Sequence, residues 1–468
     1  MTTTADVIVL GLGPGGEQVA NDLLSGGLSV IGIEAELVGG ECPYWGCIPS
    51  KMAIRAATTL AEGRRVNELA GTATITPDWS PVAQRIRAEA TDDWNDQVAV
   101  DRFVDAGGTF VRGRGTITGT RSVRVGDRDF AATRALVIAT GTSAAIPPVD
   151  GLADLDYWTN RDALKTEAVP DSLVVLGGGA IGCELAQVFR RFGAEVTIVE
   201  FAPRLIAAEE PEAGEILAQA LVDEGITVRL GVSADSVSGD GHYTVALSDG
   251  SQVSGDTVLV ATGRRVNLAA IDADALDESG LAGDGRRLPT DDYLRVLRAD
   301  GSPLDGVFGV GDVVGKGAFT HVAVTQGRMV ADQILGKDTT AFDKRAVGHV
   351  TFTDPEIGAV GLTEAQARSE GIDVVVATYP MESVSRAWIH GPPNAGILKL
   401  VVDTSTEAIV GATAVGPHAG EVLAGMTVAV AGKVPVSTLV TTVWAYPTYH
   451  RGFDAVLAEL PAQLRPSR

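Results

Sequence analysis

Two of the three cysteines in this chain, Cys42 and Cys47, stand five residues apart in the stretch GGECPYWGCIPSK at residues 39–51. Paired thiols can form a structural disulfide, bind a metal or act as a redox couple. A zinc site needs about four ligands. No CxxC motif or His cluster of suitable spacing occurs in the sequence, so we expect no metal. Because three cysteines are too few for a disulfide scaffold, the pattern favours a redox couple.

The residues that follow GGE are predicted to form the helix that positions this pair. A helix N-terminus lowers the pKa of a thiol and favours the reactive thiolate. In a straight helix, a separation of five residues places the two Cα atoms about 7.5 Å apart, which is beyond the usual span of a disulfide. We therefore expect a distorted first turn, which Pro43 and Gly46 make feasible.

Two stretches of the chain share one plan. DVIVLGLGPGGEQVANDLLSGGLSVIGIE (6–34) and SLVVLGGGAIGCELAQVFRRFGAEVTIVE (172–200) each predict a strand, a glycine-rich turn, a helix and a second strand. Both turns have the GxGxxG spacing, which lets the backbone approach a pyrophosphate at a helix N-terminus. The glycines are Gly11, Gly13 and Gly16 in the first copy and Gly177, Gly179 and Gly182 in the second.

An acidic residue ends the second strand of each copy. Glu34 and Glu200 both lie 21 residues after the second glycine, where a carboxylate is expected to hydrogen-bond an adenine ribose. Two dinucleotide sites in one chain indicate a flavin and a nicotinamide, since a hydride needs both a donor and an acceptor. Cys42 follows Glu34 closely, so we expect the first copy to place its cofactor beside the cysteines.

Composition sets the broad class. A chain of 468 residues with 45% hydrophobic residues predicts about three domains. No run approaches the roughly 20 apolar residues of a membrane span, and the N-terminus lacks the basic flank of a signal peptide, so a cytoplasmic location is expected. The formal charge of -23 disfavours binding to nucleic acid or to an anionic membrane, and we expect neither partner.

Taken together, the motifs resemble the class I pyridine nucleotide-disulfide oxidoreductases, the family of lipoamide dehydrogenase, glutathione reductase, mycothione reductase and mercuric reductase. GGECPYWGCIPSK resembles the family's redox-active segment, and the ATG-containing segments at 137–147 and 258–267 resemble its crossovers between domains. GVFGVGDVVGKGAFTHVAVTQGRMVADQI (306–334) resembles its second flavin motif, and VTFTDPEIGAVGLTEAQA (350–367) resembles the start of its dimerisation domain.

The resemblance implies an α/β fold with two Rossmann-like dinucleotide-binding domains, for FAD and NAD(P), plus a C-terminal α+β dimerisation domain. The implied FAD domain is discontinuous, at residues 1–145 and 268–345, with the NAD(P) domain at 146–267 and the dimerisation domain at 346–468. A homodimer is implied as well. The expected FAD-binding residues are Gly11, Gly13, Gly16, Glu34, Gly141, Gly311 and Asp312, and the expected NAD(P)-binding residues are Gly177, Gly179, Gly182, Glu200 and Gly263.

Catalytic roles carry over with the resemblance. Cys42 matches the thiol that meets the substrate, Cys47 the thiol that lies against the flavin, and Lys51 the lysine near flavin N5, paired with Glu184. Cys183 inherits no role and is expected to be a small core residue. Glu200 favours NADH, because a carboxylate accepts hydrogen bonds from the ribose 2'-OH and repels a 2'-phosphate. Arg204, four residues on, leaves NADPH possible.

The C-terminal segment departs from the family. Members carry His-Ala-His-Pro-Thr and a later Glu, whereas this chain has WAYPTYHRG at 444–452. Trp444 and Tyr446 therefore replace the two histidines and Arg451 replaces the Glu. A tyrosine with a pKa near 10 donates a proton but is a poor base at neutral pH. His450 is a candidate substitute, the alternative being an interface or surface histidine.

The predicted activity is an FAD-dependent NAD(P)H oxidoreductase. The resemblance implies that hydride passes from NAD(P)H through FAD to the Cys42–Cys47 pair, and on to a disulfide or another small electrophile. One alternative is a quinone reductase that acts directly from the flavin. Others are a mercuric-reductase-like or lipoamide-dehydrogenase-like activity, and a non-catalytic redox carrier subunit.

Overall fold

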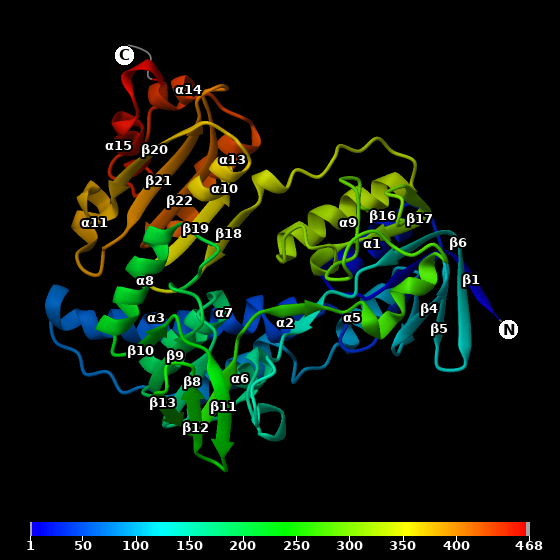
Figure 1. The fold of residues 1–468 in the computed structure, drawn as a ribbon, viewed down its shortest axis with the longest axis horizontal. Coiled ribbons are helices and arrows are strands. Elements are labelled where there is room, and N and C mark those ends of the chain that lie inside the picture. Colours follow the sequence, from blue (N-terminus) through cyan, green and yellow to red (C-terminus); the bar gives the residue numbers. More distant parts are fainter. Residues whose placement is uncertain (1, 465–468) are drawn as a thin grey trace. The chain divides into compact units, whose positions relative to one another are not determined.

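The computed structural model describes residues 2–464 and divides into two compact units. The first unit comprises Met1–Ser50, Ala83–Ala145 and Arg264–Asp343, and the second comprises Lys51–Val82, Ile146–Gly263 and Lys344–Arg468. Figure 1 traces the elements of both along the chain. The boundaries of the three predicted domains stay a prediction, and residues 465–468 of the third lie outside the described residues.

A largely parallel sheet forms the centre of the first unit, with strand order β16-β17-β6-β1-β2-β3 and a hairpin of β4 and β5 beside β6. Its strands are β1 (Thr3–Leu10), β2 (Val30–Glu34), β3 (Thr109–Arg112), β4 (Gly115–Gly119), β5 (Ser122–Val125), β6 (Arg128–Ile138), β16 (Arg295–Leu297) and β17 (Pro303–Gly309). A separate ribbon pairs β7 (Thr142–Ala144) with β15 (Arg264–Val266).

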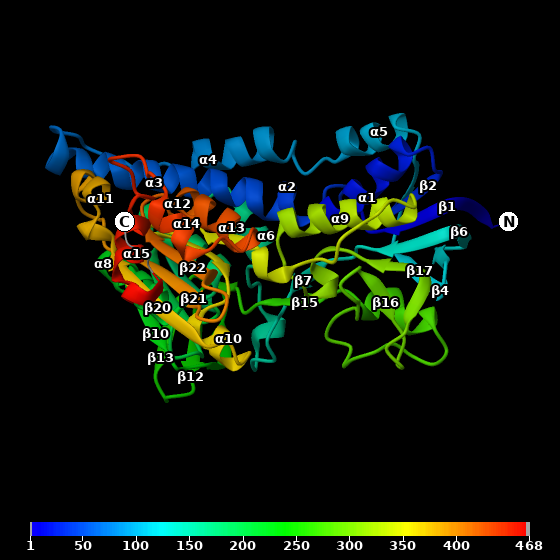
Figure 2. The same cartoon turned by 90° about the horizontal axis from the view of Figure 1, so that it is seen from above.

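Strand β1 is buried on both faces, as expected for a central parallel strand. Ile8 and Leu10 pack into the apolar core on one face of the sheet, and Val7 and Val9 pack into the core on the other. Helices α1 (Pro14–Ser25) and α9 (Thr320–Ile334) lie side by side over one face (Figure 2). The continuous apolar run of β1 is therefore explained by its central position.

The second unit contains a parallel sheet with order β10-β9-β8-β14 and an antiparallel sheet β11-β12-β13. The parallel strands are β8 (Ser172–Leu176), β9 (Glu195–Glu200), β10 (Thr227–Leu230) and β14 (Thr257–Val260). The antiparallel strands are β11 (Ala234–Gly239), β12 (Tyr243–Leu247) and β13 (Gln252–Gly255).

A five-stranded antiparallel sheet with order β18-β19-β22-β21-β20 also belongs to the second unit. Its strands are β18 (Gly348–Thr351), β19 (Glu356–Gly361), β20 (Val374–Pro380), β21 (Ile397–Asp403) and β22 (Ala408–Gly416). Helices near it in the sequence are α10 (Glu364–Ser369), α11 (Ser385–His390), α12 (Ala419–Val422), α13 (Ala424–Ala431), α14 (Val436–Thr441) and α15 (Gly452–Glu459).

The remaining helices are α2 (Glu41–Trp45), α3 (Cys47–Leu69), α4 (Ser80–Arg85), α5 (Gln97–Asp105), α6 (Asn160–Lys165), α7 (Ala180–Arg191) and α8 (Pro211–Asp223). None of the helices within residues 2–464 has the length and apolar character that crossing a membrane requires. The segments β1-α1-β2 and β8-α7-β9 form the two predicted βαβ units, each with parallel strand pairing.

Candidate active site

The two cysteines begin consecutive helices. Cys42 is the second residue of α2 and Cys47 is the first residue of α3. The sequence predicts one helix with a distorted first turn, whereas the structure breaks the helix in two at Gly46, where φ is -136° and ψ is -110°. Cys47 Sγ lies 3.4 Å from Thr320 Oγ1 at the start of α9, and no disulfide joins the two cysteines. Both thiols therefore lie at helix N-termini, where a thiolate is favoured.

Cys183 has different surroundings. Its side chain is fully buried in α7, and its Sγ donates a hydrogen bond to the Gly178 carbonyl at 3.4 Å. Burial strongly raises the pKa of this thiol, and the carboxylates of Glu184 and Glu200 raise it further. A buried thiol held in its neutral form is chemically inert, which agrees with its predicted packing role.

We expect iodoacetamide to label Cys42 and Cys47 in the reduced, folded protein and to leave Cys183 unlabelled. The rate at Cys183 should be lower by at least about 100-fold, since each unit of pKa lowers the thiolate fraction about tenfold. Peptide mass spectrometry measures the labelling, and urea-unfolded protein, in which all three react, is the control. Equal rates at the three cysteines in the folded protein would contradict the assignment.

The first glycine loop has the shape that a dinucleotide requires. Gly11 has φ +97°, and a Cβ on it would lie 2.4 Å from the Ala139 carbonyl oxygen. A Cβ on Gly16 would lie 2.0 Å from the Gly11 carbonyl oxygen, so α1 packs closely on the loop. Gly13, at the N-cap of α1, has no neighbour closer than 4.0 Å to its Cβ position. The backbone there is therefore open to a phosphate.

The Glu34 carboxylate binds the backbone of this loop. Its Oε2 accepts a hydrogen bond from the Leu12 amide at 2.7 Å, and its Oε1 accepts one from the Glu36 amide at 2.8 Å. Burial raises the pKa of the Glu34 carboxyl, while the hydrogen bonds from the two amides oppose that rise. The carboxylate is bound by its own chain, and its contact with a ribose stays a prediction.

Asp312 lies in a polar network that the sequence did not predict. Its Oδ2 accepts a hydrogen bond from Thr142 Oγ1 at 2.9 Å, and Arg264 Nε donates to the same hydroxyl at 2.7 Å. Thr142 directly follows Gly141, which has φ +62° and whose carbonyl accepts the Asn267 amide. Thr142 and Arg264 each directly follow an ATG, within the two segments that resemble the family's crossovers, but neither was predicted as a site residue.

Gln326 on α9 gives a test of whether the first unit fits FAD. Its Oε1 accepts the Gly311 amide at 2.8 Å, and the side chain is fully buried. Its Nε2 is buried without a hydrogen-bond partner, which is costly unless another group accepts that bond. An orphaned donor beside the second flavin motif, together with the open loop at Gly13, fits a bound dinucleotide.

The second glycine loop repeats the geometry of the first. Gly177 has φ +110°, and a Cβ on Gly182 would lie 2.0 Å from the Gly177 carbonyl oxygen. Nothing lies within 4 Å of the Cβ position of Gly179. Glu200 accepts hydrogen bonds from the amides of Gly178 and Ala202, as Glu34 does from Leu12 and Glu36. Gly263 ends the Ile146–Gly263 segment of the second unit and has φ +116° and an open Cβ position.

Lys51 and Glu184 lie together in the second unit. Lys51 Nζ donates to Glu184 Oε2 at 2.8 Å, and Glu184 Oε1 accepts the Phe352 amide at 2.8 Å. The ammonium also lies 4.7 Å from the centre of the Phe352 ring. Glu184 is 6% exposed, so these two hydrogen bonds hold its carboxylate in a largely desolvated place. The role of this pair beside a flavin stays a prediction.

The residues predicted to replace the family's acid-base pair lie on the C-terminal segment of the second unit. Tyr446 is 67% exposed, and Arg451 Cζ lies 5.3 Å from the centre of its ring. His450 Nε2 lies 3.2 Å from Thr448 Oγ1, and its ring lies 6.0 Å from that of Trp444. The structure thus brings Tyr446 and Arg451 together, and places His450 against Trp444 and Thr448.

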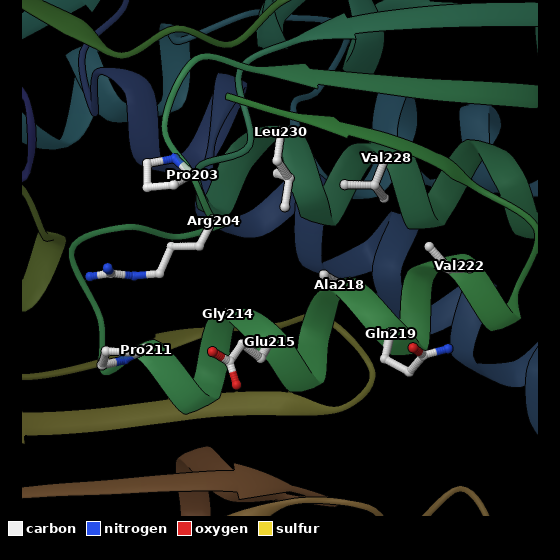
Figure 3. Close-up of a pocket in the computed structure, with 10 residues that line it drawn as sticks. All are labelled: Pro203, Arg204, Pro211, Gly214, Glu215, Ala218, Gln219, Val222, Val228 and Leu230. Carbon is white, nitrogen blue, oxygen red and sulfur yellow. The ribbon is translucent and has the colours of Figure 1, made fainter. Parts of the chain in front are cut away.

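The cavity that the structure shows most clearly is not at either glycine loop. It has a volume of about 540 Å³ and lies between α8 and β10 (Figure 3). Its lining residues are Pro203, Arg204, Pro211, Gly214, Glu215, Ala218, Gln219, Val222, Val228 and Leu230. None of the predicted site residues lines it. Within residues 2–464, no group of three or more His, Cys, Asp or Glu side chains is arranged to hold a metal ion.

Two dinucleotide-type βαβ units and an antiparallel C-terminal sheet define a two-nucleotide oxidoreductase fold. Residues 5–327 match the family model described as pyridine nucleotide-disulphide oxidoreductase, and residues 347–456 match the dimerisation domain of that family. The chain belongs to the pyridine nucleotide-disulphide oxidoreductase family. It is therefore a flavoprotein enzyme that uses FAD and a pyridine nucleotide, and its dimerisation domain supports a homodimer.

Individual relatives differ in their named activities. The chain is 31% identical to mercuric reductase from Staphylococcus aureus, over 96% of this chain and 81% of that protein. It is 33% identical to dihydrolipoyl dehydrogenase from Thermus scotoductus, over 96% of each chain. Among solved structures, the Cu(II) complex of the HOCl-induced flavoprotein disulfide reductase RclA from Escherichia coli superposes with a TM-score of 0.84 at 25% identity, covering 98% of this chain and 99% of that one.

Proposed function

We propose that Cys42 and Cys47 are the redox couple of an NADH-dependent, FAD-containing oxidoreductase whose acceptor is a disulfide or another small thiol-reactive electrophile. The observation that carries the proposal is the placement of both thiols at the first turns of α2 and α3, in a chain of this family. FAD supplies the chemistry of accepting a hydride from a nicotinamide and passing two electrons to a disulfide.

The helices that carry the two thiols favour that exchange. Cys47 begins a helix of 23 residues, so the positive end of the helix dipole lies at its sulfur. The helix breaks at Gly46 between α2 and α3, so the two cysteines are not held at the spacing of a straight helix. That spacing is too long for a disulfide. The overall reaction balances as NADH, a proton and a disulfide giving NAD⁺ and two thiols. Cys42 is the proposed attacking thiol, and its partner Cys47 closes the protein disulfide.

NADH is the proposed coenzyme. Glu200 is buried at the end of β9, where a carboxylate repels a 2'-phosphate. Arg204, the nearest candidate for a phosphate, donates from one terminal nitrogen to the carbonyls of Ala207 and Glu209. The loop engages that nitrogen alone, since Arg204 Nε is buried without a hydrogen-bond partner, so the preference for NADH over NADPH rests on Glu200.

A soft metal ion is a second candidate acceptor. Mercuric reductase from Staphylococcus aureus is similar to 96% of this chain, and the structure of RclA has been solved as a Cu(II) complex. Thiolates are preferred ligands of such ions. Replacing the family's imidazole and carboxylate by Tyr446 and Arg451 removes a base near neutral pH and adds a cation, which favours thiolates that stay ionised.

An anaerobic titration of the purified holoenzyme with NADH, and then NADPH, tests the proposal. We expect a long-wavelength charge-transfer band to grow after one equivalent of NADH while the oxidised flavin absorbance persists, because the cysteine pair takes the electrons. Absorption spectroscopy measures both signals. Flavin that bleaches with no such band would place the pair outside the electron path and favour direct reduction of quinones.

A further inference from the structure

The loop between β9 and α8, residues 201–210, lies against the second glycine loop; we refer to it as the β9–α8 loop. The Ile206 amide donates a hydrogen bond to the Gly178 carbonyl at 2.8 Å. A Cβ on Gly178 would lie 2.5 Å from Leu205 Cδ2, so the two segments are in close contact. Any shift of the β9–α8 loop therefore moves the backbone that borders the proposed coenzyme site.

The backbone of this loop is strained at the contact. Ile206 has φ +41°, a region that β-branched residues rarely adopt, and its side chain is 5% exposed. Such a conformation persists only where the surrounding contacts hold it in place. The hydrogen bond from the Ile206 amide to Gly178 and the burial of the Ile206 side chain are two such contacts.

The far end of the loop is anchored to the five-stranded sheet. His349 Nε2, on β18, lies 2.8 Å from Glu209 Oε1. Lys399 Nζ, on β21, donates to Glu210 Oε2 at 2.9 Å, and the Glu364 amide donates to Glu210 Oε1 at 2.8 Å. These anchoring residues lie in the segment that matches the dimerisation domain.

The Lys399 anchor is deeply buried. Lys399 is 3% exposed and Glu210 is 2% exposed. The same ammonium also pairs with Glu212 at 2.9 Å and with Glu364 at 3.5 Å. Breaking a buried pair of this kind leaves uncompensated charge, so the contact is stiff. Burial opposes ionisation of Lys399, but the hydrogen bonds that its ammonium donates to Glu212 and Glu210 raise its pKa above the usual value.

Arg204 forms a hydrogen bond within the β9–α8 loop. One of its terminal nitrogens donates to the Ala207 carbonyl at 2.7 Å. Figure 3 shows the Arg204 side chain directed into the curve of the loop that leads to Pro211. A Cβ on Gly214 would lie 2.6 Å from the Leu205 carbonyl oxygen, so the first turn of α8 also packs against the loop.

We propose that His349 and Lys399 are positioning residues for the coenzyme: by holding Glu209 and Glu210, they keep the β9–α8 loop and the second glycine loop in the shape that binds NADH. This inference rests on the proposed function, which places NADH at the second glycine loop. It makes the affinity for NADH depend on residues of the dimerisation segment.

His349→Leu and Glu209→Gln test the proposal in the FAD-loaded enzyme. This ion pair is chosen because both side chains are partly exposed, so the variants are expected to fold. Flavin reduction by NADH is followed anaerobically by stopped flow, which gives an apparent Kd and a limiting rate. We expect each single variant to raise the apparent Kd about three- to tenfold, and the double variant to raise it no further than the larger single effect.

His242→Leu is the matched control, because it removes another histidine–carboxylate contact, 2.7 Å from His242 Nδ1 to Asp256 Oδ1, in the same unit. The limiting rate and the FAD content should stay within about twofold of wild type in all variants, since no proposed catalytic group is changed. A Kd in His349→Leu equal to that in His242→Leu, or additive effects in the double variant, would overturn the inference. A wild-type enzyme that shows no saturable reduction by NADH would instead overturn the proposed function, and this inference with it.

Discussion

Replacing Cys42 by Ser is expected to abolish NADH-dependent reduction of disulfides and other thiol-reactive acceptors. The loss should be about 1,000-fold or more, because a serine hydroxyl neither ionises near neutral pH nor forms a disulfide with Cys47. Reduction of the flavin by NADH should continue, since Cys42 is not proposed to contact the nicotinamide. Steady-state NADH oxidation with a panel of acceptors measures the first effect, and stopped-flow flavin absorbance measures the second.

The acceptor panel separates the candidate functions. A small disulfide, Hg(II) and Cu(II) all require the thiol pair, whereas a quinone that reacts at the flavin does not. Cys183→Ser is the matched control, because it makes the same chemical change at a buried thiol that the mechanism does not use. Cys42→Ser enzyme that keeps wild-type turnover with every acceptor would rule out the thiol pathway.

The two nucleotide-binding units could be predicted from the sequence because their requirements are local. A tight turn, a close helix and an acid in register are all encoded within 29 residues, as in DVIVLGLGPGGEQVANDLLSGGLSVIGIE. The structure gives Gly11 and Gly177 the same left-handed backbone and gives Gly16 and Gly182 the same close approach. The family assignment, from motifs spread over the whole chain, is confirmed by both family models.

Features set by tertiary contacts could not be predicted in the same way. The spacing of Cys42 and Cys47 required a distortion, but only the structure shows that it is a helix break at Gly46. The amides that bind Glu34 and Glu200 depend on how each strand end meets its glycine loop. Gln326 lies within the segment that resembles the second flavin motif, but its burial and its hydrogen bond with the Gly311 amide depend on how α9 packs.

The contacts of the C-terminal segment bear on how protons reach the thiols. Arg451 lies over the face of the Tyr446 ring, and it is also the N-cap residue of α15. His450 faces Trp444 and Thr448. Within residues 2–464, His450 therefore has no carboxylate partner that would hold it as the family's Glu holds its His. We infer that proton transfer to the thiols is slow in this enzyme, and that turnover with a disulfide is slow for the same reason.

Restoring the family's pair tests that inference. In a Tyr446→His, Arg451→Glu double variant, we expect turnover with a small disulfide to rise about 10- to 100-fold near neutral pH, because a positioned imidazole contributes general acid-base catalysis of at least that size. Turnover should also acquire a pH dependence with an apparent pKa near 6.5. The glutamate is structurally acceptable at position 451, since an N-cap favours negative charge. The change removes the partly exposed pair with Asp454 at 3.7 Å and the contact between Arg451 and the Tyr446 ring.

Each half of the change has its own control. Arg451→Glu alone should leave disulfide turnover low, because it supplies no base, and Tyr446→Phe should show whether the native hydroxyl donates a proton. Rates are measured between pH 5.5 and 9, with quinone reduction as the internal reference for an intact flavin site. The double variant could gain no disulfide activity while Tyr446→Phe loses most of it. In that case the tyrosine hydroxyl is itself the proton donor, and the inference of slow proton transfer to the thiols is wrong. A gain confined to the double variant means that this enzyme's acceptor chemistry was set at the C-terminal segment, and not at the cysteines or the cofactor loops that it shares with its relatives.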